Sequence, residues 1–153
     1  MGIAYRHDEP HSISVSVWTG EVNLKQALRH VAKIAADPEW GASDRILSDL
    51  TGMDSSALPS RDQVAALAAA FSEQLDGRTR PARWAVVASS AFAEASQFGK
   101  AIDEDVRSVM VFFDLASACT WLRSDYEAVH GIIASLRVEA GRTTAWHESA
   151  RRE

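Results

Sequence analysis

The residues best placed to do chemistry gather around one polar loop. Asp49 lies in an apolar segment at 45–50, and Asp54, Ser55 and Ser56 follow it just before an amphipathic helix. A hydroxyl-rich loop between a strand and a helix presents side chains, or a phosphate, at the carboxyl end of a sheet. We interpret these four residues as a candidate interaction loop with a phosphate-accepting serine. The alternative is that the loop's hydroxyls serve the backbone of an Asx or Ser turn.

A second polar cluster contains residue types that bind metals. His7, Asp8, Glu9 and His11 lie close together in the chain. Their spacing matches no standard zinc pattern. A hairpin turn is also a natural place for solvated polar side chains. The sequence therefore predicts no metal site and no cofactor.

The remaining nucleophile and base candidates are isolated in the sequence. Cys119 lies beside Trp121 with no His or Asp next to it, so we expect a small buried hydrophobe. His30 and His130 fall within predicted helices, and we expect both on helix surfaces. Acidic residues at 103–105 are typical of a solvated turn. No catalytic residues are predicted, and we expect a protein that is not an enzyme.

The positioning elements alternate between strands and helices. The predicted strands are residues 3–7, 12–19, 45–50, 83–88 and 108–113. Apolar residues at helical spacing predict helices at 24–35, 64–75, 92–102, 118–122 and 126–140. The first of these helices is expected to begin with a capping box at Asn23 and Gln26, and the second with one at Ser60 and Gln63. Residues 38–41 and 51–59 are predicted as loops.

The second predicted strand alternates strictly between apolar and polar residues. Ile13, Val15 and Val17 share one face, whereas serines and Trp18 share the other. This period of two is typical of a strand with one buried face. Trp18 is the tryptophan best placed to line a pocket or an interface, although packing in the core is the simpler interpretation.

This order of elements predicts an α/β fold. We expect a mixed sheet of about five strands, with an N-terminal antiparallel hairpin, mostly parallel later strands and helices packed against it. Residues 1–124 would form this domain, and 125–153 an extra helix with a frayed polar tail beyond Gly141. The apolar stripe from Tyr126 to Ala140 either covers its own domain or forms a homodimer contact.

Composition narrows the class of protein further. The chain has 153 residues, one cysteine and a net charge of −5. No basic stripe suggests nucleic acid as a partner. No signal peptide is recognisable, and no apolar run approaches the ~18 residues that a membrane span needs. We therefore expect a cytoplasmic protein.

Several short motifs, taken in order, resemble a known family. They are Gly20-Glu21-Val22, Asp37-Pro38 with Trp40, Leu47-Ser48-Asp49-Leu50, Arg83-Trp84-Ala85-Val86-Val87, and Val111-Phe112-Phe113-Asp114 leading to Ala118-Cys119-Thr120-Trp121-Leu122. Together they look like the STAS-like fold, in its anti-sigma-factor-antagonist-like branch, which is related to STAS and CRAL-TRIO lipid-binding domains. The resemblance implies a non-enzymatic regulatory module with a regulatory protein or a kinase as its partner.

The family resemblance also suggests two kinds of site. Anti-sigma-factor antagonists carry an Asp-Ser-Ser-Gly loop with a phosphorylated serine, which Ser55 would match, although Ala57 replaces the glycine. The lipid-binding side of the resemblance implies instead a carrier or sensor of a small apolar ligand. Its pocket would be lined by residues that could equally fill the core, namely Phe71, Phe92, Phe98 and Trp121.

Overall fold

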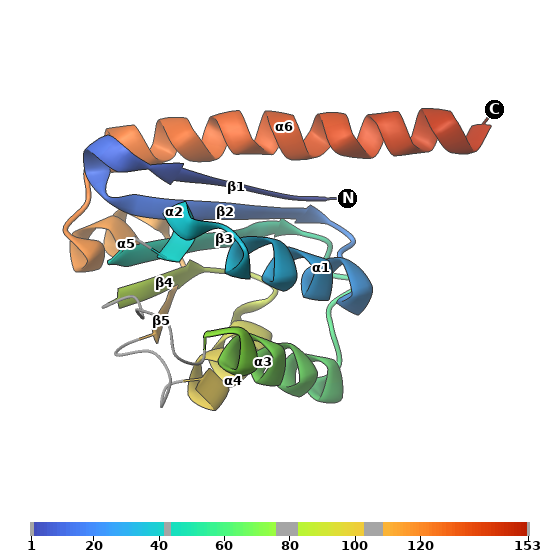
Figure 1. Ribbon diagram of the computed structural model, residues 1–153, viewed down its shortest axis with the longest axis horizontal. Coiled ribbons are helices and arrows are strands. Elements are labelled where there is room, and N and C mark those ends of the chain that lie inside the picture. Colours follow the sequence, from blue (N-terminus) through green and yellow to red (C-terminus); the bar gives the residue numbers. More distant parts are fainter. Residues whose placement is uncertain (1, 42–43, 76–82, 103–108, 153) are drawn as a thin grey trace.

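A computed structural model describes residues 2–41, 44–75, 83–102 and 109–152. Within them, a five-stranded sheet has the order β1-β2-β3-β4-β5 (Figure 1). The strands are β1 (Gly2–Asp8), β2 (Ile13–Gly20), β3 (Arg45–Met53), β4 (Arg83–Val87) and β5 (Val109–Phe112). β1 is antiparallel to β2, and every later pair is parallel. The predicted α/β fold class is therefore confirmed.

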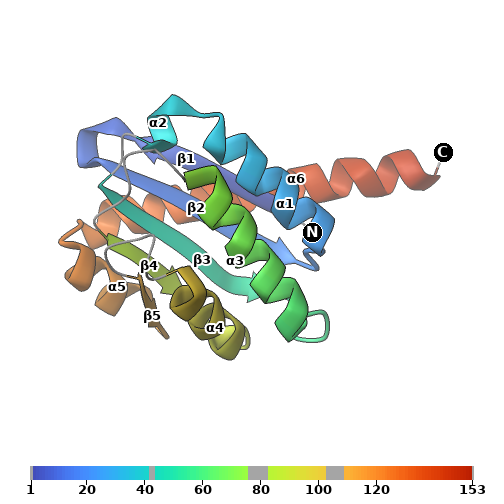
Figure 2. The same cartoon turned by 60° about the horizontal axis from the view of Figure 1, so that its bottom comes forward.

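Helices cover both faces of this sheet. The helical elements are η1 (Glu9–His11), α1 (Leu24–Ala35), α2 (Pro38–Gly41), α3 (Arg61–Leu75), α4 (Phe92–Ile102), α5 (Leu115–Leu122) and α6 (Tyr126–Arg152). Figure 2 shows α1, α3 and α4 together on one face, with α5 and α6 behind the sheet. Right-handed connections between parallel strands explain why α1, α3 and α4 share a face.

Each sheet face has its own apolar core, and the alternation along β2 assigns residues to the two cores. Ile13, Val15 and Val17 pack toward α5 and α6. Trp18 packs toward α1, α3 and α4, and Ser14 and Ser16 are buried as well. The expectation that the polar face of this strand is solvated is therefore wrong. β2 lies inside a sheet that is covered on both sides.

The two predicted capping boxes are present. Asn23 Oδ1 accepts from the Gln26 N–H at 2.8 Å, and Gln26 Oε1 accepts from the Asn23 N–H at 2.9 Å. Ser60 and Gln63 exchange the same pair of bonds at the start of α3. These local hydrogen bonds satisfy backbone N–H groups that a helix start leaves unpaired.

The structure differs from the prediction at two segments that were predicted as loops. Residues 38–41 form the short helix α2, and β3 continues to Met53. β3 extends because Gly20 and Met53 remain paired after a bulge, where β3 has one residue more than β2, and the Asp54 N–H donates to the Gly20 carbonyl at 2.8 Å. Gly20 has a φ of 68°, a left-handed conformation that glycine adopts without strain. The polar loop therefore begins at Asp54.

The last helix is longer than expected and packs on its own sheet. α6 continues to Arg152, so the chain does not lose helical structure after Gly141. Its buried stripe, Val129, Ile133, Leu136 and Ala140, belongs to the same core as β1 and β2. The apolar stripe of α6 therefore covers its own domain, which is one of the two predicted alternatives. The predicted turn at 103–105 lies outside the described residues.

Candidate functional site

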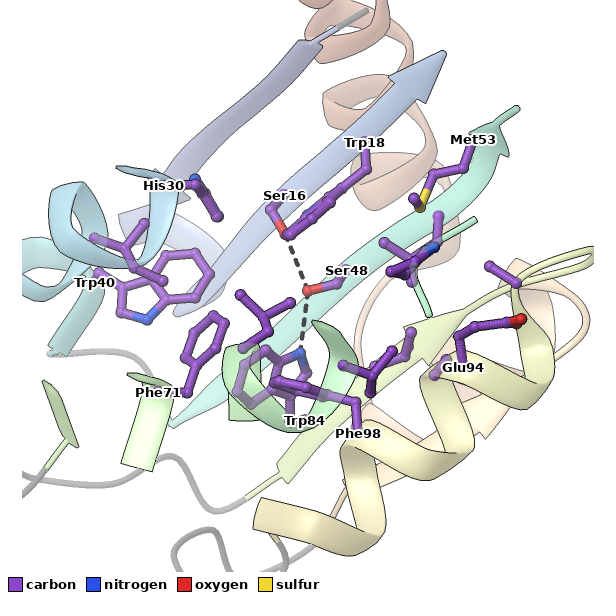
Figure 3. A pocket seen from close by; sticks show the side chains of 18 residues that line it. Ser16, Trp18, His30, Trp40, Ser48, Met53, Phe71, Trp84, Glu94 and Phe98 are labelled. Atoms are coloured by element: carbon purple, nitrogen blue, oxygen red, sulfur yellow. Dashed lines mark hydrogen bonds between the residues drawn. The ribbon is translucent and has the colours of Figure 1, made fainter. Parts of the chain in front are cut away.

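A largely apolar cavity lies between the sheet and the helices α1, α3 and α4 (Figure 3). The centre of a water-sized sphere can move through about 80 Å³ of it. One buried water needs about 10–15 Å³ by the same measure, so the cavity has room for a small organic molecule. The lining residues are Ser16, Trp18, His30, Ile34, Trp40, Ser48, Leu50, Met53, Pro59, Val64, Leu67, Phe71, Trp84, Val86, Ala91, Glu94, Ala95 and Phe98.

Three aromatic rings from three elements form one wall. Phe71 of α3, Trp84 of β4 and Phe98 of α4 pack edge to face, with ring centroids 5.2 to 5.7 Å apart. Such contacts are favourable for rings and hold them in defined orientations. Phe71 and Phe98, two of the four predicted lining residues, are therefore placed at the cavity.

The other two predicted lining residues lie elsewhere. Phe92 stacks on Phe113, with centroids 4.1 Å apart, and 69% of Phe113 is exposed. Trp121 lies on the opposite face of the sheet, where it contacts Phe112. The structure thus does not bring Phe92 and Trp121 into the cavity with Phe71 and Phe98. Helical periodicity alone could not tell which face of the sheet each helix would cover.

Two buried serines and a tryptophan form a hydrogen-bonded chain along the cavity. Ser16 Oγ donates to Ser48 Oγ at 2.9 Å, and Trp84 Nε1 donates to the same oxygen at 3.1 Å (Figure 3). The parallel register places Ser16 directly opposite Ser48, which explains the contact. Both serines are small, so they leave space where a larger aliphatic side chain would fill the interior.

Two other polar atoms at the cavity have no hydrogen-bond partner among the described residues. They are Nε1 of Trp18, a donor, and Oε2 of Glu94, an acceptor, and both atoms are buried. Trp18 as a whole is only 8% exposed. Buried polar groups in proteins are nearly always paired, because an unpaired one costs about 1–3 kcal/mol. The two atoms therefore mark this cavity as different from ordinary core packing.

His30 lies at the α1 side of the cavity and is 7% exposed. Its ring is surrounded edge-on by Tyr5, Trp18 and Trp40, with centroid distances of 5.6, 5.5 and 6.5 Å. Burial, and to a lesser extent Lys33, lowers its pKa to about 4. The prediction of a surface histidine is wrong here, because α1 turns His30 toward the sheet. At neutral pH His30 therefore contributes an uncharged side chain to the cavity wall.

The predicted interaction loop is exposed and tightly turned. Asp54 Oδ1 accepts from the backbone N–H of Ser56 at 2.9 Å and from its hydroxyl at 2.8 Å. Both bonds lower the pKa of Asp54, and the bond from the backbone N–H has the larger effect. The arrangement is an Asx turn, in which the side chains serve the backbone of the loop. Ser55 is exposed at its tip.

Asp49 has a different environment from the loop. Its carboxylate is buried on the α6 side of the sheet, where Oδ2 accepts from Arg137 at 2.7 Å. Oδ1 accepts from the Thr51 hydroxyl at 2.7 Å and from the Thr51 N–H at 3.1 Å. Sequence analysis missed Arg137 as its partner, since 88 positions separate the two residues and no local pattern connects them.

The other predicted chemical candidates are structural in this fold. His11 bonds Asp8, and His7 bonds the Ser14 hydroxyl at 3.1 Å. In the described ranges, no three His, Cys, Asp or Glu side chains are grouped so that they could hold a metal ion. Cys119 is buried as predicted, and burial, with a smaller effect of Asp125, raises its pKa to about 11. Its thiol is therefore protonated at neutral pH and a poor nucleophile.

His130 is exposed, as predicted, and lines a second, more polar hollow between α5 and α6. It stacks on Tyr126, with ring centroids 5.6 Å apart. Asp49, Thr51 and Arg137 border the same hollow. Their charges and hydroxyl are already paired with one another, so the apolar cavity remains the stronger candidate for ligand binding.

Comparison with known proteins adds one similarity. Neither a protein-family model nor a curated protein sequence matches the chain. Among solved structures, it is similar to an anti-sigma factor antagonist from Mycobacterium paratuberculosis, with 18% identity and a TM-score of 0.49. The similarity covers 79% of this chain and 94% of the other. This is the class of protein that the sequence motifs resemble, while the fold class itself rests on the strand order.

Over the part of the chain that the structure describes, no helix combines the length and the apolar character needed to span a membrane.

Proposed function

We propose that this protein is a non-enzymatic binding module that takes up a small, mainly apolar molecule in the cavity between the sheet and α1, α3 and α4. The observation that carries the proposal is the cavity itself, with the indole N–H of Trp18 buried and unpaired in its wall. An apolar pocket with a few convergent polar groups is the usual form of a small-molecule site.

The cavity is a partly open hollow that extends from the surface into the space between the sheet and the helices, and its lining is mostly apolar. Protein interiors are close-packed, and voids larger than a water molecule are few. Empty space lined by apolar side chains destabilises a fold in proportion to its volume. Ser16 and Ser48 keep this space open at the centre of the sheet. A molecule that fills the space would recover the lost contacts, which supports binding over passive packing.

A bound molecule would also influence the surface of the protein. Val64, Leu67 and Phe71 of α3 line the cavity, and the exposed loop with Ser55 immediately precedes this helix. A ligand that contacts α3 favours the positions of the helix that fit it. Occupancy of the cavity would thereby be reported at the loop, as a regulatory module requires.

Binding of an apolar probe tests this proposal. We expect p-xylene to raise the melting temperature of the wild type, because it stabilises the folded state that binds it. Ala95→Leu places a larger side chain in the cavity wall and should abolish the shift. Ala93→Leu, on an exposed position of the same helix, is the matched control and should retain it. No shift in the wild type at saturating p-xylene would contradict the proposal.

A protein-interaction role at the loop is the second candidate function. It is favoured by the exposure of Asp54, Ser55 and Ser56 on one turn next to the start of α3. A phosphate on Ser55 would add about −1.5 to −2 charges to this surface and so change partner docking. The hydroxyl of Ser56 already bonds Asp54, which leaves Ser55 as the better acceptor.

Mass spectrometry of the protein recovered from its native cell tests this second role. We expect one phosphate on the wild type and on Ser56→Ala, and none on Ser55→Ala. Both variants should keep the wild-type circular dichroism spectrum, since the two side chains are exposed. An unmodified wild-type protein under all growth conditions would count against a phosphate switch.

A further inference from the structure

The two unpaired atoms of the cavity come from opposite layers of the fold. Trp18 extends from β2 in the sheet, whereas Glu94 extends from α4 in the helical layer, and Figure 3 shows both at the same cavity. Neither Nε1 of Trp18 nor Oε2 of Glu94 has a partner among the described residues. The apolar space between the layers is therefore bordered by one donor and one acceptor.

These atoms differ in what they require. The indole N–H only donates, and a carboxyl oxygen of Glu94 accepts. Ser16, Ser48 and Trp84 already bond one another, and although each serine hydroxyl keeps further capacity, Nε1 of Trp18 and Oε2 of Glu94 are the wall atoms with no partner at all among the described residues. A molecule that enters the cavity thus gains most if it brings both an acceptor and a donor.

Simple ligand classes satisfy this requirement to different degrees. A hydrocarbon leaves both atoms unpaired. A protonated amine can donate to Glu94 but cannot accept from Trp18, and a ligand carboxylate can accept from Trp18 but faces the carboxylate of Glu94. A neutral hydroxyl group both accepts and donates. His30, uncharged and enclosed by aromatic rings, also gives no counter-charge for an anion.

We infer that the cavity is selective for neutral, hydroxylated apolar molecules, with Trp18 donating to the ligand and Glu94 accepting from it. This inference rests on the proposed function, since it concerns the same cavity. It adds the chemical class of the ligand and the two residues that select it.

Three probes of nearly equal shape test the selectivity by calorimetric titration. 4-Methylphenol can accept and donate, 4-methylanisole can only accept, and p-xylene can do neither. We expect 4-methylphenol to bind about tenfold more tightly than p-xylene, the effect of one or two hydrogen bonds in a buried site. 4-Methylanisole should fall between them. A purely apolar cavity would give the reverse order, because burying an unpaired hydroxyl is unfavourable.

Two variants test the residue assignment. Trp18→Phe keeps an aromatic ring but removes the N–H, and Glu94→Met keeps the length of the side chain but removes the acceptor. Each should reduce the preference for 4-methylphenol severalfold while p-xylene still binds. Trp121→Phe, a tryptophan substitution on the opposite face of the sheet, should leave the preference unchanged. Circular dichroism and melting curves of all three variants verify that they are folded.

The outcomes separate this inference from the proposed function. Equal binding of p-xylene and 4-methylphenol would overturn the selectivity and leave the cavity as an apolar binding site, with its polar atoms hydrated. A preference that survives both Trp18→Phe and Glu94→Met would overturn the assignment of the two residues. Failure of all three probes to bind the wild type would overturn both the inference and the proposed function.

Discussion

At the scale of single residues, His30 shows how far the fold can change the chemistry of a side chain. It lies on α1 with its ring against Tyr5, Trp18 and Trp40. These neighbours offer aromatic edges in place of water, so the charged imidazolium is disfavoured. The positive charge of Lys33, on the same helix, acts in the same direction with a smaller effect.

This environment predicts a pH-dependent stability. The pKa of His30 falls from 6.5 in the unfolded chain to about 4 in the fold. The unfolded chain therefore binds more protons between these values, and the folded state loses stability as the pH falls from about 6.5 toward 4. Between pH 7 and pH 4.5, His30 alone should account for about 2 kcal/mol of this loss. Urea unfolding at pH 7 and pH 4.5 measures it.

His30→Gln is the comparison for this prediction, since glutamine does not titrate. The variant should lose less unfolding free energy than the wild type over the same pH interval, whatever its stability at pH 7. Equal losses in the two proteins would mean that other groups cause the acid sensitivity.

At the scale of elements, one ion pair connects α6 to the end of β3. The side chain of Asp49 is 3% exposed and that of Arg137 is 51% exposed. Arg137 also donates to the Thr51 hydroxyl at 2.9 Å, so one guanidinium group joins the helix to two residues of the strand. This contact joins α6 to β3, in addition to the buried stripe that packs the helix on β1 and β2.

Removing the guanidinium should therefore destabilise the fold. Arg137→Met keeps much of the side-chain length and leaves the Asp49 carboxylate with only its Thr51 bonds. We expect a loss of about 1–2 kcal/mol in unfolding free energy, less than for a fully buried pair because Arg137 is half exposed. Arg123→Met, an exposed arginine outside this pair, is the control.

A double-mutant cycle with Asp49→Asn isolates the interaction between the two side chains. The cost of Arg137→Met should shrink in the Asp49→Asn background, because the charge partner is already gone. Additive costs would show that Arg137 stabilises the protein through its packing alone.

At the scale of the whole molecule, the sheet has an apolar core on each of its two faces. α5 and α6 shield the strand residues Ile13, Val15, Val17 and Leu47, which belong to their common core. Figure 1 shows α6 running along the full length of β1 and β2 and beyond them. The last helix is therefore an integral part of the described fold in terms of burial.

Truncation tests this dependence. A chain ending at Ser124 loses the buried side chains of Val129, Ile133, Leu136 and Ala140 and exposes the strands beneath them. Burial of each large side chain contributes about 1.5–3 kcal/mol, so the loss approaches the total stability of a typical domain. We expect no cooperative thermal transition. A chain ending at Gly141 retains the whole stripe and should unfold cooperatively; similar melting of both truncations would contradict this account.

The sequence by itself determined the five strands and most of the helices, because their signals are local. The alternation of Ile13, Val15 and Val17 with polar residues identifies a strand, and the Asn23–Gln26 pair identifies a helix start. Both patterns depend on neighbours within a few positions, where periodicity and capping act. The order of these elements then restricted the connections enough to predict the mixed sheet.

Only the tertiary structure decided the candidate site, because its members meet through register and helix placement. Ser16 and Ser48 face each other only once β2 and β3 are paired, and His30 is buried only once α1 covers the sheet. The unpaired Nε1 of Trp18 is equally invisible in a sequence. Whether a polar atom is paired and whether a side chain is buried depend on residues that are distant in the chain. A sequence pattern gives information only about residues that are close together in it.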